Sequence, residues 1–169
     1  MKTFWRQIKR EFFCVDRTML AVFAGAAVLF GIFFALGGVS RYVVGHLLFP
    51  RGALPSLVMV LLWGVMLAAL GVSAALVRSS DAAPVFVPKN MLFLLFLAAL
   101  MLCYVWIPLV YKAASFFAAL LVLAVLLLCL LAIFCGVRRS CAAVTVILAI
   151  FALWVGYLFY YTLALLLLN

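Results

Sequence analysis

The side chains in this chain that are best suited to chemistry are aromatic. Near the C-terminus, Trp154, Tyr157 and Tyr161 recur at intervals of three and four residues, with Leu158 among them. In a helix this spacing puts all four on one face, where flat rings form a wall and their N–H and O–H groups offer a few polar contacts. Polar tips in the middle of an apolar helix need partners. We therefore interpret this face as the wall of a pocket for a flat apolar ligand.

Residues for catalysis are missing from the long apolar segments. No Asp, Glu, Lys or Arg falls well inside any of them. Ion-coupled transporters depend on intramembrane charge, and enzymes need a general acid, a general base or a nucleophile. We therefore expect no catalytic residue and no enzymatic activity, and an ion-coupled transporter is disfavoured.

The cysteines and the single histidine do not form a recognisable metal site. The five cysteines include no Cys-x-x-Cys pair, and no histidine lies close enough in the sequence to complete a zinc site. His46 could ligate a haem iron, although a hydrated histidine at the membrane surface is the simpler interpretation. We expect no metal and no resident cofactor.

Composition indicates that the chain is surrounded by lipid. Hydrophobic residues make up 73% and charged residues 9%, whereas soluble domains are about half apolar and about a quarter charged. The net charge of +9 would suggest a nucleic-acid partner in a soluble protein, but these cations lie between apolar segments, as in membrane proteins. We expect a multi-pass integral membrane protein in contact with the bilayer, and no nucleic-acid partner.

Five continuous apolar segments are long enough to cross a bilayer as helices, which takes about 20 residues. Continuous hydrophobicity favours helices over the alternating strands of a membrane barrel. The predicted fold is all-α, with a single transmembrane domain over residues 19–169. Its five-helix bundle is predicted at residues 19–39, 55–77, 91–111, 113–137 and 142–168.

Residues 1–18 form a basic segment that we predict to be a short amphipathic helix lying on the membrane. Phe4, Ile8 and Phe12 are four residues apart and share one face, while the basic residues fall largely on the other. A cleaved signal peptide is disfavoured because the first apolar segment is too long and no small-x-small site follows it.

Basic residues also predict the orientation. The N-terminal segment and the second and fourth connections carry nine of the 12 Lys and Arg residues, whereas the first and third connections carry only Arg41, Arg51 and Lys112. Basic connections stay in the cytoplasm. We therefore expect a cytoplasmic N-terminus and, after five crossings, a C-terminus outside.

Small residues recur along the first two apolar segments. Ala24, Ala27 and Gly31 are spaced three or four residues apart in the first segment, and Gly64 and Gly71 belong to a similar series in the second. Such series usually mark close packing of helices. A ligand cleft is the less common alternative.

The segment "LPSLVMVLLWGVMLAALGVSAALV" resembles the second helix of the TspO family, the tryptophan-rich sensory or translocator proteins, also called peripheral benzodiazepine receptors. The family pattern has a Trp followed eight residues later by a Gly, here Trp63 and Gly71, and then a small residue and Leu-Val. Pro50 and Pro55 keep the spacing of the prolines that precede this helix in the family.

Two further segments are similar to family signatures. "LCYVWIPLVY" keeps the Trp of the third-helix signature as Trp106, but Cys103 replaces its asparagine, and "IFALWVGY" keeps the Trp of the fifth-helix signature as Trp154. The similarity runs from about Pro50 to Asn169 with almost no gap, and the chain ends on Leu-Asn, as bacterial members do. A bacterial cell membrane is the expected location.

The resemblance implies a five-helix bundle, often dimeric, with a pocket under the first outer connection. Members of the family bind tetrapyrroles such as protoporphyrin, and some bind sterols, isoquinolines or benzodiazepines. Carried over to this chain, the ligand-binding positions are Trp63, Cys103, Trp106, Trp154, Leu158 and Tyr161, with the connection from Pro50 to Pro55 as a roof.

Departures from the family pattern fall on the pocket. Leu67 replaces a tyrosine, Phe49 a lysine and Thr162 a late asparagine, while Leu158 replaces a small residue and should narrow the pocket. No Lys or Arg follows Arg139, so the family's sterol motif, which is a weak pattern in any case, is not supported.

We interpret the chain as a TspO-like membrane protein that binds a flat hydrophobic ligand, a porphyrin or related tetrapyrrole, for sensing or transport. The alternative is a small structural or accessory membrane subunit with no small-molecule ligand. Light-dependent porphyrin degradation, proposed for some family members, is a third and enzymatic hypothesis. A homodimer is expected from the resemblance alone.

Overall fold

The structure is a computed structural model that describes residues 6, 17–38, 45–79, 88–138 and 141–169. These residues form five long helices and no strand, which confirms the predicted all-α, five-helix fold. The helices are α2 (Arg17–Gly38), α4 (Ser56–Ser79), α5 (Lys89–Tyr111), α6 (Phe116–Val137) and α7 (Ala142–Leu168). The predicted amphipathic helix over residues 1–18 lies almost entirely outside the described residues.

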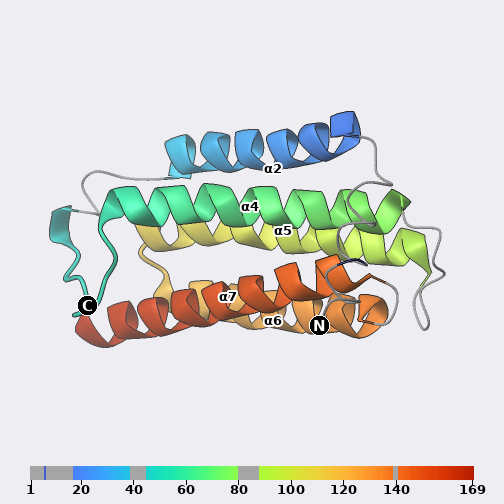
Figure 1. Cartoon of the computed structure of the whole chain (residues 1–169). Coiled ribbons are helices and arrows are strands. Elements are labelled where there is room, and N and C mark those ends of the chain that lie inside the picture. Colours follow the sequence, from blue (N-terminus) through green and yellow to red (C-terminus); the bar gives the residue numbers. More distant parts are fainter. Residues whose placement is uncertain (1–5, 7–16, 39–44, 80–87, 139–140) are drawn as a thin grey trace.

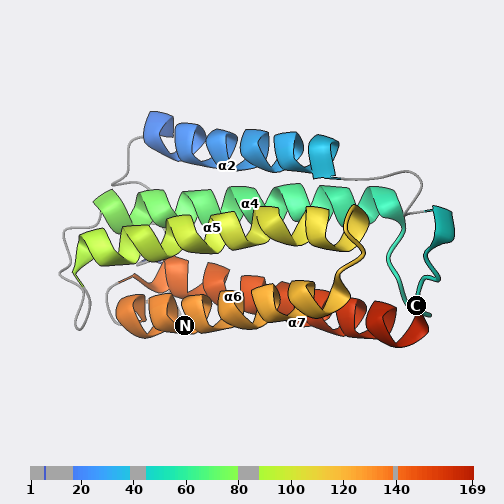
Figure 2. The ribbon, with the colours of Figure 1, turned by 180° about the vertical axis from the view of Figure 1, so that it is seen from behind.

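The helices pack side by side in an arrangement that Figures 1 and 2 show from opposite sides. Helix α2 covers α4 and α5, α5 contacts α6, α6 contacts α7, and α4 contacts α7. The C-terminus, residues 45–55 and the turn between α5 and α6 all lie at one end of the bundle (Figure 1). Residues that are far apart in the sequence therefore meet at this end.

Four helices, α4 to α7, are long and apolar enough to cross a membrane. Within α2 the stretch Met19–Leu29 is apolar as well. Large apolar side chains point away from the bundle on every helix, including Leu36 at 81% exposed and Leu153 at 78%. A soluble protein does not leave so much apolar surface in water, but lipid is a suitable solvent for it.

Helix α6 begins later than the sequence predicted, at Phe116 instead of residue 113. The chain first makes a tight turn in which Ala114 has a φ of 50°. The N–H of Ser115 donates to the carbonyl oxygen of Leu109 at 2.9 Å and closes the turn. Residues 113 and 114 are alanines, which suit a helix, so the geometry of the turn excludes them and not their residue type.

Helices α2 and α4 approach each other closely at Gly71. A methyl group placed on Gly71 would lie 2.5 Å from the carbonyl oxygen of Phe23 and 3.2 Å from the Cα of Ala24. Both are backbone atoms, so no side chain can rotate away to make room. At Gly71 the series of small residues lets the backbones of the two helices come together, which is the usual role of such a series.

We predict that Gly71→Ala destabilises the protein although alanine is the better helix former. In an open helical position the change gains about 0.5–1 kcal/mol, but forcing α2 and α4 apart costs roughly 1–3 kcal/mol. Thermal unfolding in detergent should therefore show a lower Tm. Gly156→Ala is the matched control, because its added methyl group has no atom within 4 Å; equal Tm values for both variants would contradict the prediction.

Candidate ligand-binding site

A cavity of about 380 Å³ lies under residues 45–55, between α2, α4, α5 and α7. This volume falls within the range of about 300–1,000 Å³ that is usual for small-molecule sites. Val28 and Gly31 of α2 line one side, and Met59 and Gly64 of α4 line another. Among the described residues that line it there is no Asp, Glu, Lys, Arg or His. The cavity therefore suits an uncharged, largely apolar group.

Three of the predicted binding residues line this cavity: Trp63 from α4, Trp106 from α5 and Tyr161 from α7. All three side chains are at least 90% buried, at 8%, 1% and 3% exposed. The bundle thus brings together aromatic rings from three helices that are widely separated in the sequence. The prediction that they bind a ligand stays a prediction.

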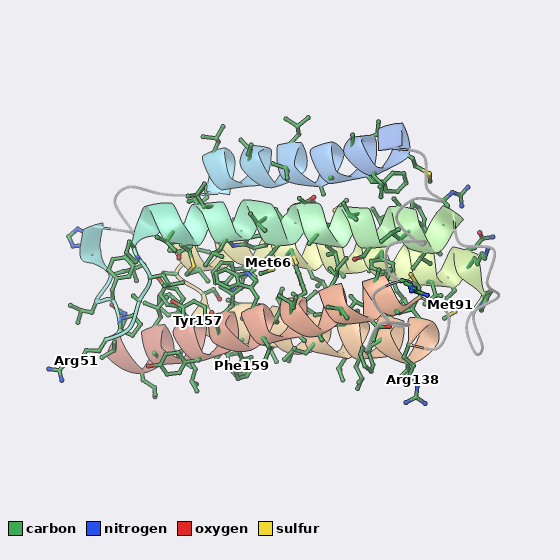
Figure 3. The ribbon with its side chains drawn as sticks, in the orientation of Figure 1. Arg51, Met66, Met91, Arg138, Tyr157 and Phe159 are labelled. Carbon is green, nitrogen blue, oxygen red and sulfur yellow. The ribbon has the colours of Figure 1, made fainter. Side chains whose placement is uncertain are left out.

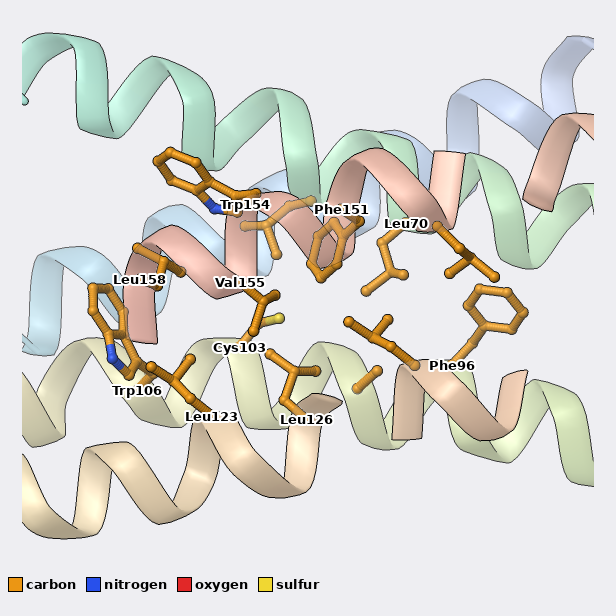
Figure 4. Close-up of a cluster of buried hydrophobic side chains, with 14 of the residues drawn as sticks. Leu70, Phe96, Cys103, Trp106, Leu123, Leu126, Phe151, Trp154, Val155 and Leu158 are labelled. Atoms are coloured by element: carbon orange, nitrogen blue, oxygen red, sulfur yellow. The ribbon is translucent and has the colours of Figure 1, made fainter. Parts of the chain in front are cut away.

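The other three predicted residues of the helices lie deeper. Cys103, Trp154 and Leu158 surround a second, closed space that adjoins the first through Trp63 and Trp106. This inner space has no volume free for a water molecule, and Leu158 is one of the side chains packed around it (Figure 4). Of these two spaces, the outer cavity is the one with room for a ligand.

Residues 45–55 form the roof of the cavity, although the two predicted prolines are not part of its lining. Phe49, Ala53 and Leu54 line it instead. Pro50 is buried and Pro55 is exposed at the start of α4. The prolines flank the lining residues, so the sequence pattern located the roof but not the side chains that face the cavity.

The roof is held down by the last helix at two points. The N–H of Leu54 donates to the hydroxyl oxygen of Tyr157 at 3.1 Å. The N–H of Leu48 donates to Oδ1 of Asn169 at 2.9 Å, and Nδ2 of Asn169 donates back to the carbonyl oxygen of Leu48 at 3.2 Å. The final residue of the chain thus acts as a two-way clamp on the roof.

The aromatic side chains form two rows. Trp63 and Trp106 are tilted against each other at a centroid distance of 6.1 Å, and Trp106 meets Tyr111 edge-on at 6.0 Å. On α7 the stacked rings are Trp154, Tyr157 and Tyr161, with centroid distances of 5.4 and 6.3 Å. The Tyr111 hydroxyl donates to the Tyr161 hydroxyl at 3.2 Å and joins the two rows.

The buried indole N–H groups differ in whether they have a partner. Nε1 of Trp106 donates to Oγ1 of Thr162 at 3.1 Å, and that hydroxyl donates to the carbonyl oxygen of Leu158 at 2.8 Å. Nε1 of Trp63 and Nε1 of Trp154 are buried and have no hydrogen-bond partner among the described residues. An unsatisfied buried donor costs about 1–3 kcal/mol, so an acceptor delivered by a ligand to Trp63 would recover free energy.

Some lining residues were not predicted from the sequence. Gly64 was assigned to helix packing, yet a methyl group placed on it would have no atom within 4 Å, because it borders the cavity. Tyr111 is not one of the predicted binding residues, but it lines the cavity and pairs with Tyr161. Only the position relative to neighbouring helices distinguishes these residues from others of their type.

A model of the TspO/MBR family matches residues 18–168. The chain belongs to the TspO/MBR family. The match covers nearly the whole chain and includes all five helices, so the family resemblance read from the sequence motifs is confirmed. Among curated proteins, none matches the chain.

Family membership and the four long apolar helices together establish a TspO-like integral membrane protein. All eight positions that the resemblance singled out fall within the matched residues. Six of them surround the two adjoining spaces in the bundle, and the two prolines flank the roof.

We predict that Thr162→Val destabilises the fold, because it removes the acceptor of Trp106 and leaves a third buried indole without a partner. The expected loss is about 1–3 kcal/mol in the free energy of unfolding, measured by thermal or denaturant unfolding in detergent. Thr162→Ser keeps the hydroxyl and should remain close to the unmodified protein. If the valine and serine variants were equally stable, the Trp106–Thr162 bond would have no net effect on stability.

Proposed function

We propose that this TspO-like protein binds a flat hydrophobic ligand, a porphyrin or related tetrapyrrole, in the cavity under residues 45–55. The observation that carries the proposal is the pair of buried indoles, Trp63 and Trp106, which line a cavity of about 380 Å³ whose described lining residues carry no charge. The role would be sensing or transport of the ligand. The family is known for receptors and transporters, and we place this chain among its non-enzymatic members.

The chemistry of the lining supports this ligand class. Aromatic pairs contribute about 0.5–1.5 kcal/mol beyond the burial of area, and the indoles of Trp63 and Trp106 offer faces to a flat ring. The Nε1 donor of Trp63 has no partner among the described residues and could bond to a ligand acceptor. Because no charged side chain lines the cavity in the described part of the chain, any carboxylates of the ligand would stay outside it.

The proposed orientation puts the roof on the outer side of the membrane. Arg51 projects from the roof end of the bundle and Arg138 from the opposite end (Figure 3). Arg78 and Lys89 end α4 and begin α5 on the side of Arg138. Arg17 begins α2 at the same end, so among the described residues the end opposite the roof is the more basic, and it is the proposed cytoplasmic side. A bacterial membrane and a homodimer belong to the same proposal.

The test is a titration of the purified protein with protoporphyrin, followed by quenching of tryptophan fluorescence. Gly64→Leu should weaken binding by roughly tenfold or more, which corresponds to about 1.4 kcal/mol, because the new side chain projects into the cavity. Gly156→Leu is the matched control: it also meets no atom within 4 Å, but it lies on an exposed face of α7. Its affinity should equal that of the unmodified protein.

Trp63→Phe gives a second readout. The substitution keeps an aromatic ring but removes both the unpartnered N–H and one of the quenched fluorophores, so affinity and maximal quenching should both fall. Absence of saturable quenching in the unmodified protein, together with co-purification of a stoichiometric protein partner, would replace this function with that of an accessory subunit. Light-dependent loss of the porphyrin absorption band that depends on the tryptophans would instead indicate an enzyme.

A further inference from the structure

The wall of the cavity between α2 and α4 is incomplete among the described residues. Ile32 of α2 and Val60 of α4 both line the cavity, yet they are 50% and 69% exposed on the outside of the bundle. The residues facing them across the cavity, such as Trp106 at 1%, are fully buried. The cavity therefore has a side that reaches the outer surface of the bundle, and this surface faces the acyl chains.

The packing of α2 on α4 explains why the opening is at this level. The two helices run antiparallel, and their backbones are pressed together at Phe23 and Gly71. About two turns closer to the roof, Gly64 of α4 has no atom within 4 Å of the position of its missing methyl group. Because α2 and α4 are in close contact at Gly71 and have open space at Gly64, the gap between them lies in the half of the bundle nearest the roof.

The roof, in contrast, is held in place by hydrogen bonds, although its lining residue Phe49 is itself 48% exposed. Leu54 is bonded to Tyr157, and Leu48 is bonded in both directions to Asn169. Phe49, Ala53 and Leu54 add apolar side chains beneath this frame. A ligand arriving from water would have to break the bonds and then cross apolar side chains, whereas a ligand already dissolved in lipid would meet only apolar side chains at Ile32 and Val60.

We propose that the ligand reaches the cavity sideways from the membrane, through the opening between α2 and α4 bounded by Ile32 and Val60, and not through the roof. The inference rests on the proposed function, because it concerns access to the same cavity. It restricts the ligand to molecules that partition into the bilayer and present an apolar edge. The roof then serves as a fixed lid that prevents loss of the ligand to water. The opening between α2 and α4 still allows exchange of the ligand with the membrane.

The experiment measures association and dissociation rates of protoporphyrin with the full-length protein in phosphatidylcholine vesicles. Val60→Phe and Ile32→Phe place a larger, non-fluorescent side chain at the opening. Val65→Phe is the matched control, since Val65 is 61% exposed on the same helix but does not line the cavity. Asn169→Ala removes the clamp from Leu48 and tests the roof.

Sideways access predicts that each opening variant slows association by about tenfold relative to Val65→Phe. Val65→Phe and Asn169→Ala should keep the unmodified rates. Unmodified rates in both opening variants, or faster association in Asn169→Ala, would overturn the inference while leaving ligand binding intact. If the unmodified protein did not bind protoporphyrin at all, the proposed function and this inference would both fall.

Discussion

The contact between α2 and α4 at Gly71 is the constraint on which the remaining architecture depends. Inside a bilayer there is no hydrophobic drive that pushes helices together, so association relies on close packing and on hydrogen bonds. Gly71 lets the backbone of α2 approach through Phe23 and Ala24. Further along, the hydroxyl of Tyr104 donates to the carbonyl oxygen of Ala27 at 2.8 Å and ties α2 to α5. These contacts hold α2 firmly at one level, and the cavity lies between this level and the roof.

The polar atoms of the buried aromatic side chains fall into two groups, those with a hydrogen-bond partner and those without one. Trp106, Tyr111 and Tyr157 all have partners, and their bonds connect α5, α7 and the roof into one frame. Trp63 and Trp154 do not have partners among the described residues. Buried donors are rarely left unpaired in native structures. The unpaired donor of Trp63 beside the cavity supports the proposed ligand, whereas Trp154 borders a space with no room for one.

The structure shows what two of the replacements relative to the family pattern do. Thr162 in place of an asparagine still accepts from the indole of Trp106, so the frame survives the change. Leu158 in place of a small residue is 2% exposed and packs beside Trp154 in the inner space. The volume available to a ligand is therefore shifted toward α2 and the roof, where Gly31 and Gly64 border it.

The sequence by itself determined the helical fold, the membrane environment and the family, because continuous hydrophobicity and the spacing of Trp63, Trp106 and Trp154 are local properties of the chain. Only the tertiary structure showed that Asn169 clamps Leu48, since a contact across 121 positions leaves no local pattern. The same reason separates Gly64 from Gly71: both are small residues at helical spacing, but one borders empty space and the other a neighbouring backbone. Which indoles are paired, and which side of the cavity is open, follow from how the helices pack and not from the residues that compose them.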